Sequence, residues 1–264
     1  MPEISSKHLP DVQSTEDSRN IAIDLVGVKG VSVPVSIVSQ GELQHTVAQV
    51  NMLVALPAAR KGTHMSRFVQ LLERRGYTVD TAQLKDFLVE MLSELDASEG
   101  RIDFAFPFFM KKKAPVSELP SLLKYDVRMS VVAKSGDMFV EQECVIPVTT
   151  LCPCSKEISK YGAHNQRSHV TIAIRTHEFI GLEEHVRFAE DNASCELWSG
   201  LKRVDEKFVT ERAYENPKFV EDLVRDVAVA MNRDPRIDAY RVEAENFESI
   251  HDHSAYGRIV RGNL

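Results

Sequence analysis

Residues 151–168 read LCPCSKEISKYGAHNQRS. Cys152 and Cys154 flank a proline, which fixes one backbone dihedral and restricts the conformations of the loop. His164 follows in a run rich in lysine, asparagine, glutamine and arginine, which is poor material for a hydrophobic core. Thiolate and imidazole groups are ligands of zinc and similar divalent ions. The segment therefore predicts a metal-binding loop.

A second histidine-rich stretch, NFESIHDHS, occupies residues 246–254. His251 and His253 share a face if this stretch is extended. A metal held by few protein ligands keeps a position open for water, whose pKa then falls from 15.7 to about 7. From these residues alone, other interpretations stay open. The cysteines can be small buried side chains or half of a structural zinc site, and the histidines can be structural or solvated.

The segments around these motifs predict an alternation of strands and helices. Apolar alternation predicts a strand over 21–39, a second extended run to about residue 56, and a strand that carries Phe104, Phe106 and Phe108 on one face. Two helical segments lie between them, the clearer one over 84–95. Further along, the pattern predicts a hairpin of 123–134 and 138–150, a strand around 170–174, a helix from Asn216-Pro217, and strands near 236–245 and 254–260.

A short internal match suggests a duplication. Gly62, His64 and Arg67 form the pattern G-x-H-x-x-R, and the same pattern recurs at 162–167 after another predicted hairpin. The second copy has cysteines upstream and the first has none nearby. The first half therefore reads as a copy of the second that has lost the metal chemistry.

Composition excludes several classes of protein. The net charge of −7, without a long basic stripe, argues against general nucleic-acid binding. No apolar run approaches the roughly 20 residues of a membrane span, and the polar N-terminus has no signal-peptide core. We therefore expect a cytoplasmic protein whose four cysteines are thiols or metal ligands. Residues 1–20 are expected to form a flexible arm.

Three segments together resemble the prokaryotic type IB GTP cyclohydrolases: LCPCSKEISKYGAHNQRSHV at 151–170, NPKFVEDLVRD at 216–226 and ENFESIHDHSAY at 245–256. The resemblance covers nearly the whole chain from about residue 20 and implies an α+β tunnelling fold of two fused ββαα halves. The halves would be 21–120, without metal ligands, and 121–264, with the metal and catalytic residues. Their antiparallel sheets would assemble into barrels between subunits, in a homotetramer with active sites at subunit interfaces.

The same resemblance implies the reaction. GTP and water would give 7,8-dihydroneopterin triphosphate and formate, the first step of tetrahydrofolate biosynthesis, through water attack at guanine C8. One divalent metal per site, zinc or manganese, would activate the water. Its ligands would be Cys152, His164, Glu206 and His251, with Glu211 competing for the place of Glu206. The resemblance also implies catalytic roles for a further group of residues: Cys152, Cys154, His253 and Glu221.

Substrate recognition needs an acceptor for guanine and cations for triphosphate. A carboxylate can accept the guanine N1–H and 2-amino group together, and Glu248 is the candidate. The candidate cations for the triphosphate are Lys61, His64, Arg67, Lys160 and Arg167. Rival functions are a nitrile reductase, a pterin-site aldolase, and a non-catalytic purine-binding or zinc-storage protein. The chain lacks the glycine-rich dinucleotide loop that an NADPH enzyme would favour.

Overall fold

A computed structural model describes residues 11–39, 41–76, 78–79, 81–177 and 180–264. The described strands form one nine-stranded sheet in the order β3-β1-β2-β4-β5-β6-β7-β8-β9. All neighbouring pairs are antiparallel except β1 with β3. The strands are β1 (Ile23–Ser39), β2 (Glu42–Leu56), β3 (Thr78–Val79), β4 (Gly100–Lys113), β5 (Pro120–Lys134), β6 (Asp137–Leu151), β7 (Asn165–Thr176), β8 (Ile237–Phe247) and β9 (Ser254–Arg261).

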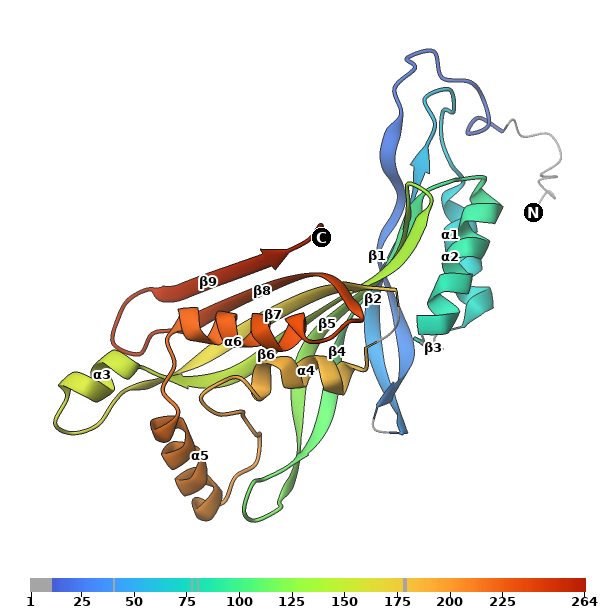
Figure 1. The fold of residues 1–264 in the computed structure, drawn as a ribbon. Coiled ribbons are helices and arrows are strands. Elements are labelled where there is room, and N and C mark those ends of the chain that lie inside the picture. Colours follow the sequence, from blue (N-terminus) through green and yellow to red (C-terminus); the bar gives the residue numbers. More distant parts are fainter. Residues whose placement is uncertain (1–10, 40, 77, 80, 178–179) are drawn as a thin grey trace.

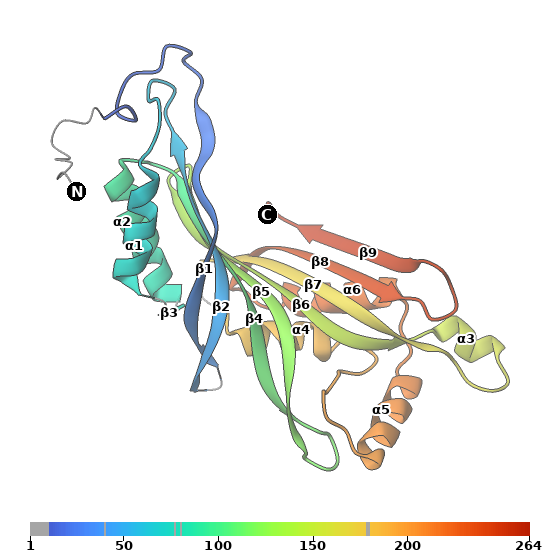
Figure 2. The same cartoon turned by 180° about the vertical axis from the view of Figure 1, so that it is seen from behind.

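Helices lie along one face of this sheet (Figure 1). They are α1 (Met65–Arg75), α2 (Thr81–Leu95), α3 (Pro153–Ile158), α4 (Leu182–Glu190), α5 (Arg203–Glu215) and α6 (Val220–Asn232). The pair α1 and α2 covers the N-terminal end of the sheet, and α4 and α6 cover the C-terminal end, while α3 projects at the far tip (Figures 1 and 2). No helix among the described residues is both long and apolar enough to cross a lipid bilayer.

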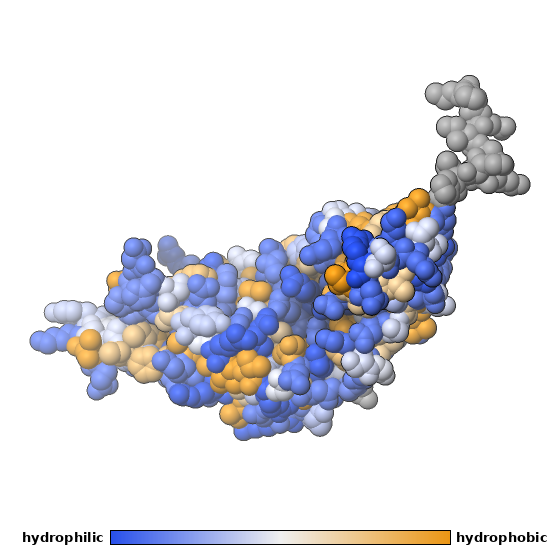
Figure 3. Space-filling view, turned by 90° about the horizontal axis from the view of Figure 1, so that it is seen from above, coloured by the Kyte–Doolittle hydropathy of each residue, from blue (hydrophilic) through white to orange (hydrophobic). Residues whose placement is uncertain are grey.

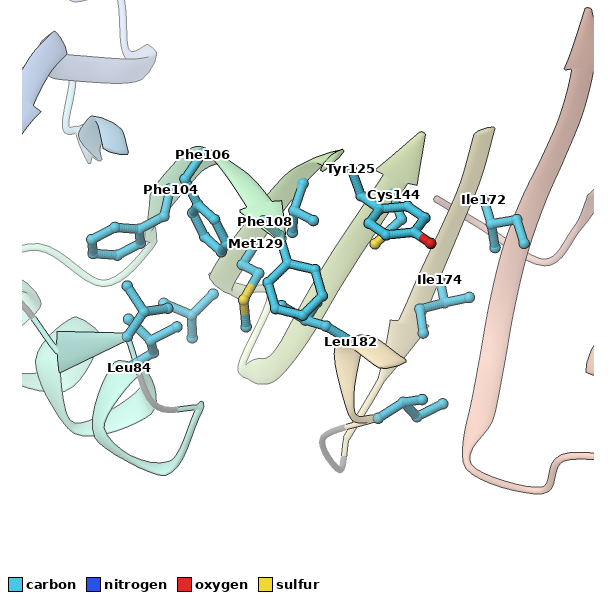
Figure 4. Close-up of a cluster of buried hydrophobic side chains, with 14 of the residues drawn as sticks. Leu84, Phe104, Phe106, Phe108, Tyr125, Met129, Cys144, Ile172, Ile174 and Leu182 are labelled. Carbon is cyan, nitrogen blue, oxygen red and sulfur yellow. The ribbon is translucent and has the colours of Figure 1, made fainter. Parts of the chain in front are cut away.

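Alternating side chains explain why the helices collect on one face. Strands expose successive residues on opposite faces, and the paired positions Val50, Phe104 and Met129 are all buried on the helix side. Figure 4 shows this core, with Phe104 and Phe108 of β4 next to Met129 of β5 and Leu182 of α4. The buried apolar residues of both ends belong to one connected cluster.

The opposite face carries charges instead of helices. Cross-strand ion pairs join Arg175 to Glu141 at 3.1 Å and Arg241 to Glu143 at 2.7 Å. Figure 2 shows this side of the sheet without a covering layer, and Figure 3 shows mixed polar and apolar residues on the molecule seen from above.

The expected tunnelling fold of two fused ββαα halves is wrong. The first copy of G-x-H-x-x-R runs into helix α1, whereas the second runs into strand β7. The second half contains four of the described helices, against two in the first, and returns to the sheet through β8 and β9. A three-residue match does not set a backbone conformation, and the apolar alternation after His164 dictates a strand there. The predicted boundary at 120/121 falls after the first residue of β5, a strand that pairs with β4 along the whole length of β4.

Residues 11–17 of the expected N-terminal arm contact the loop before α1. The backbone amides of Lys61 and Gly62 donate to the carbonyls of Thr15 and Gln13. Residues 1–10 of the expected arm lie outside the described residues.

A buried histidine in α4 predicts loss of stability in acid. His185 is fully buried, its Nε2 lies 3.1 Å from the carbonyl oxygen of Ile172, and burial lowers its pKa from 6.5 to about 4. Between these pH values, the unfolded chain therefore binds a proton on His185 and the folded chain does not. We expect the free energy of unfolding to fall by roughly 3 kcal/mol as pH drops from about 6.5 to about 4.

Urea unfolding at a series of pH values measures how the free energy of unfolding changes with pH. The variant His185→Gln keeps a polar side chain without a titrating ring. The free energy of unfolding of this variant should therefore depend less steeply on pH over this range, by the uptake of about one proton. Equal slopes in the two proteins would show that His185 does not titrate between the two states.

Candidate active site

The Cys152 loop and the start of β7 are joined by backbone and serine hydrogen bonds. The backbone N–H of Cys152 donates to the carbonyl of His164 at 3.2 Å. Ser155 connects the two segments, because its N–H donates to Cys152 Sγ at 3.4 Å and its Oγ accepts from His164 N–H at 3.3 Å. Cys152 is the N-cap of α3, with Pro153 at the first helical position. The loop thus brings the backbone of Cys152 next to that of His164.

The C-terminal loop meets this pair from β8. Ser249 Oγ lies 3.1 Å from His164 Nδ1, so Nε2 is the ring nitrogen without a described partner. Glu248 Oε1 accepts a 3.1 Å hydrogen bond from Gln166 Nε2. The pairing of β7 with β8 produces this meeting, since it sets Ser168 opposite Asn246. Two motifs about 80 residues apart in sequence therefore converge at one end of the sheet.

The remaining expected metal ligands are not gathered around this pair. His251 and His253 are exposed, with stacked rings whose centroids lie 5.1 Å apart. Glu206 and Glu211 are exposed on α5, and Glu211 lies 3.3 Å from Lys207. Among the described residues, no three histidine, cysteine, aspartate or glutamate side chains lie close enough together to hold a metal ion.

Helix α5 is held against the β4–β5 turn by a carboxylate that sequence reasoning missed. Asp205 is fully buried and accepts from Val116 N, Ser117 N and Ser117 Oγ at 2.6–2.9 Å. These hydrogen bonds hold the pKa of Asp205 well below its usual range against the opposing effect of burial. The same carboxylate accepts from Lys202 N–H at the helix start, which is a capping-box arrangement. Asp205 thereby fixes the position of its neighbour Glu206.

The other expected site residues of the C-terminal half are exposed. Cys154 is exposed on α3, and Glu221 is exposed in the first turn of α6. Lys160 and Arg167 are both exposed. Arg167 lies on the face of β7 opposite to its buried neighbours.

The thiols of the chain fall into two classes. Burial raises the pKa of Cys195 to about 11 and that of Cys144 further, so both stay protonated and act as core side chains. Cys152 is half-buried and Cys154 is exposed. Only the second pair is accessible to a metal or a substrate.

The expected cations of the first half lie elsewhere. Lys61 is exposed, His64 Nε2 lies 3.3 Å from Asp11 Oδ2, and Arg67 donates to the carbonyl of Glu94 at 3.1 Å. These residues stand at α1, whereas Cys152 stands at α3, and both views place these helices at opposite ends of the sheet (Figures 1 and 2). One chain alone does not bring the two sets together.

A family model described as type I GTP cyclohydrolase folE2 matches residues 9–257. The chain belongs to this family. Proteins named GTP cyclohydrolase FolE2 are similar along nearly their whole length. The one from Paraburkholderia xenovorans is 57% identical over 254 residues, covering 96% of this chain and 95% of that protein. The one from Thiobacillus denitrificans is 54% identical over 252 residues, covering 95% and 94%.

Comparison of this FolE2-family structure with solved structures finds similar folds in other proteins. A highly active BTUO mutant aligns with a TM-score of 0.51 and 9% identity, covering 91% of this chain and 100% of that chain. Urate oxidase from Bacillus subtilis 168 aligns with a TM-score of 0.48 and 9% identity, covering 90% and 98%. At such identities the likeness concerns the fold alone.

Proposed function

We propose that the end of the sheet where β6, β7 and β8 meet α3 is the site at which this member of the FolE2 family acts on GTP. Membership makes the chain a GTP cyclohydrolase of folate biosynthesis with GTP as substrate. We also propose that this chain is a type IB enzyme and that it is located in the cytoplasm. The observation that carries the site is the junction of Cys152 and His164 with the Glu248 loop, through Ser155, Ser249 and Gln166.

The donor chemistry at this junction fits a divalent metal. A half-buried thiol and an imidazole with a free Nε2 are donors that suit zinc, and the carboxylate proposed below is a donor that suits manganese. We propose Cys152 and His164 as two ligands, with His251 and Glu206 completing the set and Glu211 as the alternative carboxylate. When bound, the metal supplies Lewis acidity that makes water a nucleophile at neutral pH.

Protein groups around the junction have separate roles in the proposal. Glu248 accepts the guanine N1–H and 2-amino group and so orients C8 of the base. His253, Cys154 and Glu221 are candidates for moving protons during ring opening, a contribution of typically 10²–10⁴ in rate. Lys160 and Arg167 are exposed cations beside the loop and suit the triphosphate.

Incubation of metal-loaded protein with GTP tests this proposal. Formate release together with a pterin that becomes fluorescent after oxidation is the expected result. Metal binding without formate would instead favour a non-catalytic purine-binding or zinc-storage protein.

The distance between the two cation sets favours an oligomer. The segment around α3 is unusually apolar for a protruding tip, since Ile158 is 78% exposed, Tyr161 98% and Ile250 64%. Burial of these side chains against another subunit would stabilise an assembly of this kind. We therefore propose a homotetramer with active sites at subunit interfaces, in which Lys61, His64 and Arg67 serve the site of a neighbour.

A subunit-mixing experiment tests this arrangement. Arg67→Ala should weaken binding of GTP much more than binding of guanosine, with unchanged metal content, and the loss should shrink with added salt because salt screens charge contacts. Inactive Cys152→Ala and Arg67→Ala subunits should regain partial activity when mixed. No recovery after verified subunit exchange would remove Arg67 from a shared site.

A further inference from the structure

A buried glutamine beside Glu248 has an acceptor without a donor. Gln166 is only 7% exposed, and its Nε2 donates a 3.1 Å hydrogen bond to Glu248 Oε1. Its own carbonyl oxygen, Oε1, is buried and has no hydrogen-bond partner among the described residues. An unmet buried acceptor is costly, so natural proteins leave few of them unless a ligand or water satisfies them.

The orientation of this amide is set by its neighbour. A carboxylate accepts hydrogen bonds, so Gln166 must turn its NH₂ group toward Glu248, and its carbonyl oxygen must point elsewhere. Glu248 therefore fixes where the free acceptor of Gln166 is presented.

A second unmet acceptor lies on the adjacent strand. Asn246 is 2% exposed, and its Oδ1 also lacks a described partner. Strand pairing sets Asn246 opposite Ser168. Ser168 and Gln166 are two positions apart on β7, so their side chains lie on the same face of the sheet. The end of β7 and β8 thus holds a carboxylate and two unpaired amide oxygens, a set of acceptors that suits a ligand edge rich in donors.

We propose that Gln166 is a specificity-determining residue that accepts the guanine 2-amino hydrogen not taken by Glu248. This inference rests on the proposed role of Glu248 in the same site. The recognition edge of guanine carries three N–H hydrogens, one on N1 and two on the amino group. The carboxylate of Glu248 takes the N1 hydrogen and one amino hydrogen. The remaining amino hydrogen needs a separate acceptor, and the Oε1 atom of Gln166 supplies it.

Inosine triphosphate is the natural probe, because it keeps N1–H and the triphosphate but lacks the amino group. The metal-loaded enzyme is assayed for the KM of GTP and for the Ki of inosine triphosphate as a competitive inhibitor. Gln166→Met preserves size and removes the acceptor. We expect the KM of GTP to rise roughly three- to tenfold, the range for one neutral hydrogen bond, while the Ki of inosine triphosphate changes less than about twofold.

Gln142→Met is the matched control. Gln142 is also fully buried, but both ends of its amide bond the backbone of Ile180. This variant makes the same chemical change in the same fold and should keep the ratio of the two constants.

Two outcomes would overturn the inference. Equal weakening of both nucleotides by Gln166→Met would mean that Gln166 acts only by holding Glu248, since the N1 contact is common to both. An unchanged KM for GTP would mean that Gln166 does not face the base. Failure of the underlying site is recognised separately, because Glu248→Gln would then leave GTP binding unaltered.

Discussion

Replacement of Cys152 by alanine should abolish formate release from GTP and leave the protein with much less bound metal. Cys152 is the only thiol in the proposed ligand set, and its loss removes the charged soft ligand. Mutation of a residue that only hydrogen-bonds to a metal ligand typically lowers metal affinity or activity 10–100-fold. For the loss of a ligand itself, we expect turnover to fall by more than about 100-fold.

The fold should survive this change. Cys152 Sγ accepts a single weak hydrogen bond, from Ser155 N–H at 3.4 Å, whose loss costs about 0.5–1.5 kcal/mol. Cys195→Ala is the matched control, because it removes a buried thiol from the same half of the chain, and it should retain metal. Elemental analysis and the formate assay measure both quantities. Near-normal turnover with full metal content in Cys152→Ala would rule this residue out as a ligand.

Glu248→Gln should weaken GTP binding roughly 100-fold while metal content and the fold remain intact. The change places an amide donor against guanine donors, and losing charge-assisted hydrogen bonds costs about 3 kcal/mol. The variant also loses the carboxylate that orients Gln166, so discrimination against inosine triphosphate should fall with it.

Glu245→Gln is the matched control for this prediction, since Glu245 is a nearby carboxylate that lies on the opposite face of β8 from Asn246. Equilibrium binding of GTP to each purified variant provides the measurement. If Glu245→Gln weakened binding and Glu248→Gln did not, the guanine anchor would be Glu245.

Secondary structure was predictable for most strands with one buried face, although α4 was not predicted despite its buried apolar side. The predicted strand at 21–39 is β1, and the predicted hairpin is β5 and β6, because apolar alternation is strong in these segments. Helix α5 was missed for the opposite reason. Only Asp205 and Ala213 of α5 are buried, so its sequence has no apolar stripe, and a buried carboxylate holds it in place instead.

Tertiary arrangement was less accessible to sequence reasoning. The two expected halves share one sheet because β4 pairs with β5 along its whole length, and alternation within each strand does not reveal its partner. Gln166 looked like one polar residue among many in its segment. Only the register between β7 and β8 shows that it is buried and bonded to Glu248.

Metal titration of the metal-free protein tests the central claim most directly. We expect formate release from GTP to be negligible at the start, to rise in proportion to added zinc or manganese, and to level off at one metal per chain in the wild type but not in Cys152→Ala. Full formate release by the metal-free protein, or the same titration curve in Cys152→Ala, would contradict the proposal that the Cys152–His164 junction holds the metal for this reaction.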